Sequence, residues 1–270
     1  HKAVSQIERE AQRRLFERTS FGTVATRACQ SLTQAARLAF YELDQADSEL
    51  SEFGGREVGR IVIGALPLSR SALLPEVLVN FREQRPTISI SVLDGPYDEL
   101  LAGLRRGEID FLLGALRDPA PIGDIRQHRL FDDSLVLLCG RIHPLANKRD
   151  VSLGDLASYP WIVPRKGTPT RAQFDALFDD LKYSAPFKII ESGSILLMRE
   201  MLDLSDHLGC ISRLQAEAEI SKGLLAELDF EMDQPSRPIG LTTRGSWTPT
   251  AAQQQLLDLL EAIAPGRGGH

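Results

Sequence analysis

The chain has 270 residues, of which 43% are hydrophobic and 25% are charged. This length allows two or three compact units with a substantial core, and the composition is that of a soluble globular protein. The net charge of -6 excludes a protein that coats nucleic acid over its whole surface, so any contact with DNA is expected to be local.

The N-terminal segment predicts an amphipathic helix with a basic polar face. Val4, Ile7, Ala11 and Leu15 recur at helical spacing. Residues 1–27 contain six lysines and arginines against three glutamates. Such a local excess of positive charge fits either a phosphate-binding segment or a solvated helix face.

Three motifs follow one another in this region and favour the first reading. They are Ala3-Val4-Ser5-Gln6, Ile7-Glu8-Arg9-Glu10 and Leu15-Phe16-x-Arg18-x3-Gly22-x3-Thr26-x-Ala28. Together they resemble the recognition helix, scaffold helix and wing of the LysR-type transcriptional regulators. The chain departs from that family at two places: Cys29 stands where a glycine is usual, and Ala11-Gln12 replaces the usual leucine-glycine.

The resemblance implies a winged helix-turn-helix that is only partly present. Such a module needs a first helix to hold the recognition helix in the major groove of DNA, and none precedes the motif in this sequence. We therefore expect residues 1–25 to be a partial DNA-binding domain that is displaced or poorly packed. The side chains expected to contact promoter DNA in the intact protein are Lys2, Ser5, Gln6, Arg9, Arg13 and Arg18.

One long helix is predicted from Thr26 to Phe53, a stretch without proline or glycine. Its apolar residues form a heptad-like stripe, and the helix is about 40 Å long, too long for that stripe to be buried in one small domain. We expect it to pair with the same helix of a second subunit, the alternative being packing on its own domain. Gly54-Gly55 breaks the helix within a linker region of residues 26–56. The expected dimer contacts are Leu32, Ala35, Ala39, Leu43, Ala46 and Leu50.

Strands and helices alternate after the linker, which predicts parallel βαβ units. The predicted strands are 60–65, 87–93, 109–114, 134–139, 161–163, 187–191, 209–212 and 239–243. The predicted helices are 71–84, 97–106, 152–156, 171–181, 195–204 and 250–263.

Several motifs of this region resemble the LysR-type effector-binding domain. They are Gly64-x2-Pro67, Leu74-Pro75, Phe81-x4-Pro86, Leu100-Leu101-x2-Leu104-x2-Gly107-x-Ile109-Asp110, His143-Pro144-Leu145 and Tyr159-Pro160-Trp161. The resemblance implies an α/β fold of the type 2 periplasmic-binding-protein-like class, with two lobes around a cleft. The effector-binding domain is then residues 57–270, with lobe one about 59–131 plus 239–266 and lobe two about 132–238.

A ligand of an open α/β sheet binds at the carboxyl ends of the strands, near helix N-termini. In lobe one this rule selects the segments that follow the first three strands. The candidate effector contacts there are Pro67, Leu68, Ser69, Arg70, Gly95, Pro96, Tyr97 and Leu116. Tyr97 is either an aromatic wall of the site or part of the core, and each serine is either a ligand donor or a helix cap.

In lobe two the segment from Pro164 to Arg171 combines cations, hydroxyls and a glycine at a strand-to-helix turn. Arginine can grip a carboxylate, sulfonate or phosphate with two hydrogen bonds, and a threonine can bond the same group at the helix start. The candidate effector contacts are Arg165, Gly167, Thr168, Pro169, Arg171, Ser192 and Ser194. The alternatives are helix capping for the hydroxyls and a solvated loop for the cations.

The sequence predicts no enzyme, cofactor or metal. His128 and His143 are conceivable general bases, but no carboxylate is clearly placed beside them, and the histidines show no metal-ligand spacing. Cys139 and Cys210 lie in apolar strands and are expected to be inert buried thiols rather than a redox pair. No apolar run approaches the roughly 20 residues of a membrane span, and the N-terminus is unlike a signal peptide, so a cytoplasmic location is expected.

The leading functional hypothesis is a LysR-type regulator, a homodimer or homotetramer, whose two-lobed domain binds a small organic acid and alters transcription. The alternative is a small-molecule-binding protein of the same cleft fold that does not bind DNA. Effector binding would act by favouring one of two conformations.

Overall fold

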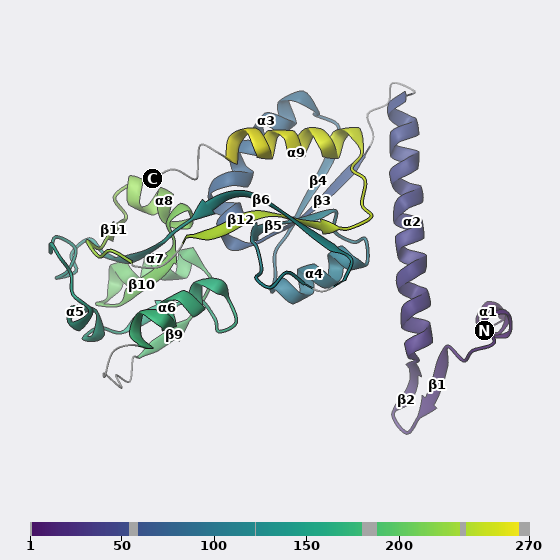
Figure 1. The fold of residues 1–270 in the computed structure, drawn as a ribbon, viewed down its shortest axis with the longest axis horizontal. Coiled ribbons are helices and arrows are strands. Elements are labelled where there is room, and N and C mark those ends of the chain that lie inside the picture. The colour runs from purple at the N-terminus through teal and green to yellow at the C-terminus, as the bar shows by residue number, and fades with distance from the viewer. Residues whose placement is uncertain (1, 54–58, 122, 180–187, 233–235, 265–270) are drawn as a thin grey trace.

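The structure, a computed structural model, describes residues 2–53, 59–121, 123–179, 188–232 and 236–264 (Figure 1). Within these residues the chain forms an N-terminal helix and hairpin, one long helix, and two α/β lobes that lie beside each other. The predicted two-lobed α/β architecture is confirmed. The Gly54-Gly55 break, and the predicted element ends at Leu181 and Phe187, lie outside the described residues.

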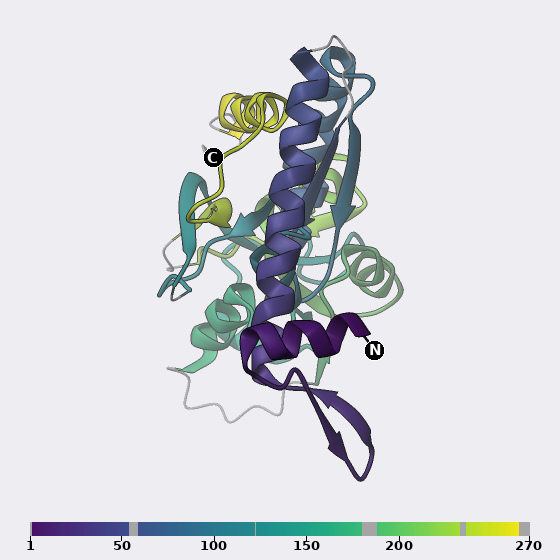
Figure 2. The ribbon, with the colours of Figure 1, turned by 90° about the vertical axis from the view of Figure 1, so that its right-hand side faces the viewer.

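The segment before Thr26 has almost no core of its own. Its elements are α1 (Lys2–Ala11), β1 (Phe16–Thr19) and β2 (Gly22–Ala25). No residue of α1 is buried, and every residue of the hairpin is exposed. Leu15 is buried, and its amide donates to Glu8 Oε1 at 2.7 Å. The predicted poor packing is confirmed, and Figure 2 shows α1 crossing one end of the long helix.

Gln12 follows α1 in a conformation that favours glycine. Its φ is 51°, in the left-handed region where L-residues are strained. The amide of Arg13 donates to the carbonyl of Glu8 at 3.2 Å, a bond typical of a Schellman helix end. Gln12, at the position where LysR-type proteins usually carry glycine, therefore has a left-handed backbone conformation that glycine adopts more readily.

α2 (Arg27–Phe53) is one continuous helix, as predicted. It packs on the first lobe through the half-buried side chains of Leu38, Tyr41 and Gln45. At about 100° per residue, the predicted dimer stripe is centred about 130° around the helix from this packed side. The stripe residues, all exposed, are Leu32, Ala35, Ala39, Leu43, Ala46 and Leu50. The helix therefore packs on its own domain and leaves the stripe uncovered.

The described sheet of lobe one has the strand order β4-β3-β5-β12-β6. Its strands are β3 (Arg60–Ala65), β4 (Ser89–Leu93), β5 (Phe111–Ala115), β6 (Ile125–Asp133) and β12 (Arg237–Arg244). The first three run parallel, as predicted for βαβ units, whereas β12 is antiparallel to both β5 and β6. The C-terminal strand thus returns into the first sheet.

Helices cover both faces of this sheet. They are the short π-helix η1 (Ser69–Leu73), α3 (Leu74–Gln84), α4 (Tyr97–Arg105) and α9 (Ala251–Ile263). On one face Phe81 of α3 and Leu256 of α9 are buried in a cluster with residues of β3, β5 and β12. On the other face Leu104 of α4 packs with Ile109 and Leu112. The sheet of lobe one is therefore packed between helices on both faces.

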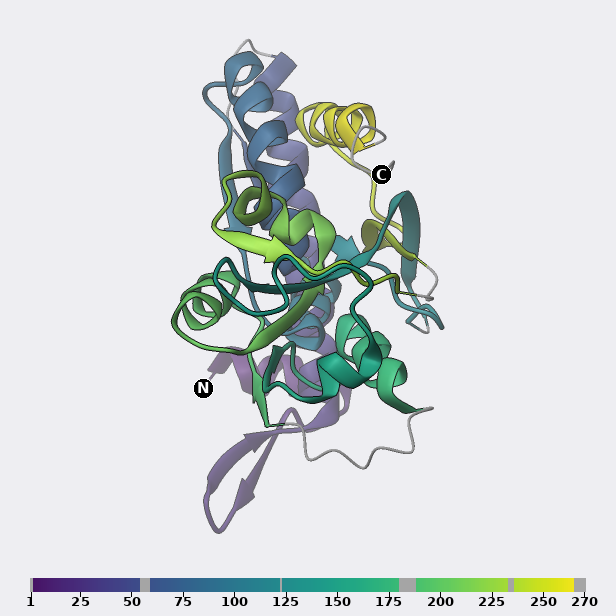
Figure 3. The same ribbon diagram turned by 90° about the vertical axis from the view of Figure 1, so that its left-hand side faces the viewer.

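Lobe two, which faces the viewer in Figure 3, repeats this plan with the strand order β11-β7-β10-β8-β9. Its strands are β7 (Leu135–Gly140), β8 (Trp161–Val163), β9 (Ile189–Glu191), β10 (Leu208–Ser212) and β11 (Leu225–Glu227). Its helices are α5 (Leu153–Ala157), α6 (Pro169–Asp179), α7 (Ile195–Leu204) and α8 (Arg213–Ser221). Trp161 packs with Phe174 on one face, and Leu138 with Met198 on the other.

Three described elements, β6, α8 and β11, were not predicted from the sequence. β6 is an edge strand in which charged and polar residues interrupt the apolar ones, so it lacks a continuous apolar run. α8 buries Gln215, Ala216 and Glu219 rather than large apolar side chains. Both are stabilised by tertiary contacts that the local pattern does not reveal.

Candidate functional site

The loop that follows β3 is committed largely to the fold of lobe one. Leu68 and Ser69 are buried, and Ser69 Oγ donates to the carbonyl of Leu113 in β5 at 2.7 Å. This bond links the carboxyl ends of β3 and β5. Pro67, by contrast, is half-buried and begins the turn into η1.

Arg70 does not stand free at this edge of the sheet. Its Nη1 lies 2.9 Å from Asp94 Oδ2, in the loop that follows β4, and both side chains are substantially exposed. Gly95 and Pro96 are exposed beside that loop, and Pro96 is the N-cap of α4. An anion that binds Arg70 must therefore compete with a carboxylate for it.

Tyr97 is covered by an arginine that the sequence analysis did not select. The guanidinium of Arg117, which follows β5, lies 4.1 Å from the centroid of the Tyr97 ring. The Tyr97 hydroxyl is buried and has no hydrogen-bond partner among the described residues. Burial raises the pKa of Tyr97, and the positive charge of Arg117 partly offsets this. The ring of Tyr97 is therefore covered by the Arg117 guanidinium in a cation–π contact and is not an uncovered aromatic wall of the site.

Arg117 is fixed by its backbone. Its amide donates to Gln127 Oε1 at 2.8 Å, and its carbonyl accepts from Gln127 Nε2 at 3.0 Å. Burial lowers the pKa of the guanidinium, and nearby Arg237 lowers it further. Leu116 is half-buried, and its amide donates to Pro238 at 2.9 Å. Two arginines are therefore held near one another at the carboxyl end of β5.

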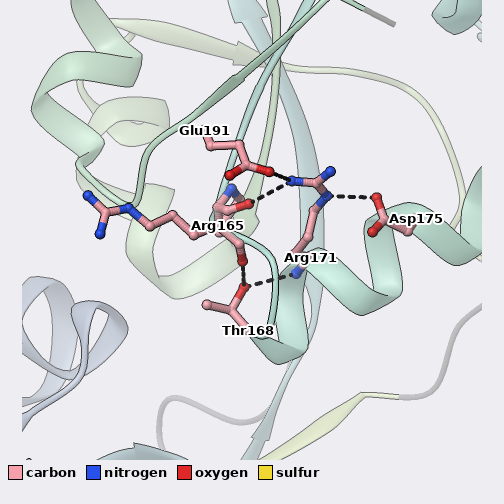
Figure 4. A network of polar contacts seen from close by, with 6 residues as sticks. Arg165, Thr168, Arg171, Asp175 and Glu191 are labelled. Atoms are coloured by element: carbon pink, nitrogen blue, oxygen red, sulfur yellow. Dashed lines mark hydrogen bonds and ion pairs between the residues drawn. The ribbon is translucent and has the colours of Figure 1, made fainter. Parts of the chain in front are cut away.

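In lobe two Thr168 caps a helix (Figure 4). Its Oγ1 donates to the carbonyl of Arg165 at 2.9 Å and accepts from the amide of Arg171 at 3.2 Å. Gly167 has a φ of 83°, the left-handed geometry that this turn requires, and Pro169 is the first residue of α6. The hydroxyl of Thr168 is occupied by the turn itself.

Arg171 corrects a prediction from the sequence. Its side chain is only 5% exposed, and its Nε donates to Asp175 Oδ1 at 2.7 Å while its Nη1 donates to Glu191 (Figure 4). The guanidinium is therefore held between two carboxylates and joins α6 to β9. Local sequence placed Arg171 beside a turn but did not reveal these partners.

Arg165 has the opposite environment. It is exposed, and its side chain has no hydrogen-bond or ion-pair partner among the described residues. Figure 4 shows it extending away from Arg171. Lys166 is exposed beside it. Of the two predicted arginine grips in this segment, only Arg165 is free to bind an anion.

Ser192 and Ser194 shape the turn between β9 and α7. Ser194 Oγ accepts from the amide of Leu197 at 3.3 Å, which caps α7, and Ser192 Oγ accepts from the amide of Ser194 at 3.1 Å. Each hydroxyl acts here as an acceptor, so each retains a proton that can be donated. Helix capping, the alternative for these hydroxyls, is therefore what the geometry shows for Ser194, whereas Ser192 stabilises the turn before it.

A largely buried ion pair lies at the edge of the lobe-one sheet where the chain crosses between the lobes. Arg237, the first residue of β12, donates to Asp133 Oδ2 from Nε at 3.2 Å and from Nη2 at 2.8 Å. Asp133 also accepts from Ser212 Oγ at 3.0 Å, and Arg237 also donates to Thr170 in α6. Arg237 thus links the strand of lobe one to the helix that carries the Arg165 turn.

Residues 54–264 match the LysR substrate binding domain family. The chain belongs to that family. The HTH-type transcriptional regulator GalR of Pseudomonas putida is 33% identical over 92% of this chain and 62% of its own length. This LysR chain therefore spans less than two thirds of that relative.

Solved structures agree with the fold of this LysR chain. A full-length OxyR variant of Pseudomonas aeruginosa, 20% identical, has a TM-score of 0.69 and aligns with 96% of this chain and 86% of its own. The effector-binding domain of QuiR in complex with shikimate, 19% identical, has a TM-score of 0.63 and aligns with 77% of this chain and 98% of its own. Both place the lobes in the predicted type 2 periplasmic-binding-protein-like class.

Among the described residues of this LysR chain, no group of three His, Cys, Asp or Glu side chains is arranged to hold a metal ion. Nor does any described helix combine the length and hydropathy needed to cross a membrane. Cys139 and Cys210 are fully buried, and burial raises the pKa of each thiol to about 12. Their prediction as buried thiols is confirmed.

Proposed function

We propose that this chain is the sensor and linker part of a LysR-type transcriptional regulator that binds a small organic anion between its lobes. The observation that carries the proposal is Arg165, an exposed and unneutralised arginine at the N-terminus of α6. Lys166 and the amides of the first turn of α6 add positive potential there. The shikimate bound by QuiR is the kind of small carboxylate that this arrangement suits.

We assign the other candidate contacts different roles in this proposal. Arg165 grips the anion, and Ser192 and Ser194 supply hydroxyl protons from the neighbouring turn. Arg117, lying on Tyr97, supplies a second cation from lobe one. Arg171 only positions the turn. The apolar and backbone surface comes from Pro67, Gly95, Pro96 and Leu116, whereas Leu68 stays in the core of lobe one.

The binding site is tested by calorimetric titration of a panel of small carboxylates that begins with shikimate. Replacing Arg165 with alanine removes the grip, so affinity for the ligand found should fall about 10-fold or more, as for a lost charge-assisted hydrogen bond. Arg149→Ala is the matched control, because Arg149 is exposed on lobe two beside Asp229. Equal affinity in the Arg165→Ala variant and the control removes Arg165 from the site.

DNA binding is the second part of the proposal and concerns the intact regulator. Lys2, Ser5, Gln6, Arg9, Arg13 and Arg18 are exposed, so promoter DNA can reach them. Each arginine that contacts a phosphate contributes about one to the slope of log K against log salt. Arg13→Ala and Arg18→Ala in the intact regulator should each reduce that slope, measured by fluorescence anisotropy, whereas Arg149→Ala should not. An unchanged slope in both favours a small-molecule-binding protein without DNA contact.

Assembly completes the proposal. The uncovered apolar stripe of α2 pairs with the same helix of a second subunit, giving a homodimer or, through further contacts, a homotetramer. A regulator of this kind acts in the cytoplasm, where its promoter DNA lies, and is not an enzyme.

A further inference from the structure

α2 approaches lobe one closely where α4 gives way to β5. Gly107, with a φ of 74°, follows the C-cap of α4, and a Cβ at this position would lie 3.1 Å from Leu38 and 3.2 Å from Tyr41. The absence of a side chain at this glycine lets the helix come into contact. At the margin, Arg37 Nη1 lies 3.0 Å from Glu108 Oε1, and both groups are about half exposed. Figure 2 shows α2 running across this side of the lobe.

Tyr41 lies at the centre of this contact and has three polar partners. Its hydroxyl donates to Asp110 and accepts from Trp247 Nε1 at 3.1 Å. The guanidinium of Arg244 lies 4.6 Å from the centroid of its ring. Farther along the helix, Gln45 accepts from Gln253 of α9 at 2.9 Å. Different parts of lobe one therefore converge on one phenol of α2.

Asp110 needs the Tyr41 hydroxyl. The carboxylate is 1% exposed, and its other oxygen accepts from the amide of Val62 at 2.6 Å. Burial and the adjoining Asp110 raise the pKa of Tyr41 to about 12, so the phenol remains a donor at neutral pH. Without that donor, a buried carboxylate loses a charge-assisted hydrogen bond. Loss of an exposed ion pair at the edge of this interface costs much less, because water replaces the lost partner there.

Two strands connect this contact with the candidate site. Asp110 precedes β5, whose other end leads to Arg117, and Arg244 ends β12, whose first residue is Arg237. β5 and β12 are paired with each other from Ile239 opposite Ala115 onward. One end of this strand pair therefore meets Tyr41, and the other meets the junction of the lobes.

We propose that Tyr41 is a positioning residue that latches α2 to lobe one, so that the helix and lobe one move as one rigid body while lobe two moves against both. The latch itself needs neither ligand nor DNA. Only its use in regulation, to turn a lobe movement into a reorientation of the helix pair, rests on the proposed function.

The latch is tested by the distance between two spin labels, one on α2 and one on α3. Gln30→Cys and Glu83→Cys provide exposed sites, in a Cys29→Ser background that leaves only buried native thiols. Labelled chains are diluted with unlabelled ones so that distances within one chain are measured. We expect one narrow distance in the parent and a clearly broadened distribution in Tyr41→Phe, which keeps the ring and removes only the hydroxyl.

Two further variants separate the latch from general destabilisation. Trp247→Phe removes the indole donor to Tyr41 and should also broaden the distribution, whereas Tyr159→Phe, in lobe two, should leave it narrow. Hydrogen exchange of residues 37–45 should rise about 10-fold or more in Tyr41→Phe, the size of one lost charge-assisted hydrogen bond. A narrow distance and unchanged exchange in both Tyr41→Phe and Trp247→Phe would overturn the latch, and this outcome leaves the proposed ligand site untouched.

Discussion

Arg237 and Asp133 are directly opposite each other in the β12–β6 pair of lobe one, and their side chains form an ion pair whose members also bond to Thr170 and Ser212 of lobe two. The arginine side chain is 11% exposed and the aspartate side chain 1%. Removing one member of such a pair leaves a buried charge without its partner.

Arg237→Ala should therefore lower the free energy of unfolding by about 3 kcal/mol, since breaking a buried pair costs about 3–5 kcal/mol and Asp133 retains other donors. Urea denaturation monitored by circular dichroism measures it. Arg129→Ala is the control, because Arg129 pairs with Asp132 on the same strand and is largely exposed. That change should cost less than about 1 kcal/mol. Equal losses in the free energy of unfolding for the two substitutions would show that the Arg237 pair stabilises the fold no more than an exposed ion pair does.

Substitution of Arg171 should lower the free energy of unfolding much more than substitution of Arg165. Arg171→Ala removes the link between α6 and β9 and should lower the free energy of unfolding by about 2 kcal/mol, the scale of hydrogen bonds to charged groups. Arg165→Ala should change it by less than about 0.5 kcal/mol, as expected of a solvated side chain. Thermal denaturation without ligand distinguishes them. A destabilised Arg165→Ala variant would mean that Arg165 has a structural role instead.

The exposed stripe of α2 predicts a dimer that a single charge disrupts. Leu43 is 64% exposed in the isolated chain, so Leu43→Glu should not affect the fold but should bury a carboxylate in the helix pair and shift the protein toward monomer. Light scattering after gel filtration measures the mass. Gln30→Glu, outside the stripe, is the control and should remain dimeric. A dimer that persists in Leu43→Glu assigns assembly to another surface.

The three cysteines should react at two very different rates. Cys29 is partly exposed, whereas burial raises the pKa of Cys139 and Cys210 from 9.0 to about 12. A thiol reagent at pH 8 should titrate one equivalent quickly and the other two only on unfolding. Cys29→Ser should abolish the fast phase. Fast reaction of Cys139 or Cys210 in that variant would show that the lobe around them opens readily.

The same two buried thiols predict a dependence of stability on pH. Their pKa in the folded state lies above the unfolded value, so their contribution is complete below about pH 9 and is lost as the pH rises toward about 12. The free energy of unfolding, measured by urea at pH 8 and pH 10.5, should be lower at the higher pH. Cys139→Ala should reduce that difference, and an undiminished difference would assign it to other groups.

Local pattern in the sequence was enough for the elements with strong periodicity or caps. The unbroken Arg27–Phe53 helix and the Ser152 cap of α5 follow from neighbours within a few positions. The motifs that resembled LysR-type proteins gave the two-lobed class. Elements without an apolar run, such as α8, required the surrounding core to define them.

The candidate site was located by sequence only to the level of loops. Strand ends and helix starts are local features, so they were sufficient to select the Arg165 turn. Whether each side chain was free depended on distant partners: Arg171 meets Glu191 across 20 positions, and Tyr41 meets Asp110 across 69.

The sequence by itself therefore determined the family, the order of the main elements and the segments where charge gathers. Only the tertiary structure decided which arginine is neutralised, which tyrosine is covered, and which side of α2 remains open. The physical reason is that hydrogen bonds and ion pairs act over a few ångströms, while Arg237 and Asp133 are separated by 104 positions along the chain.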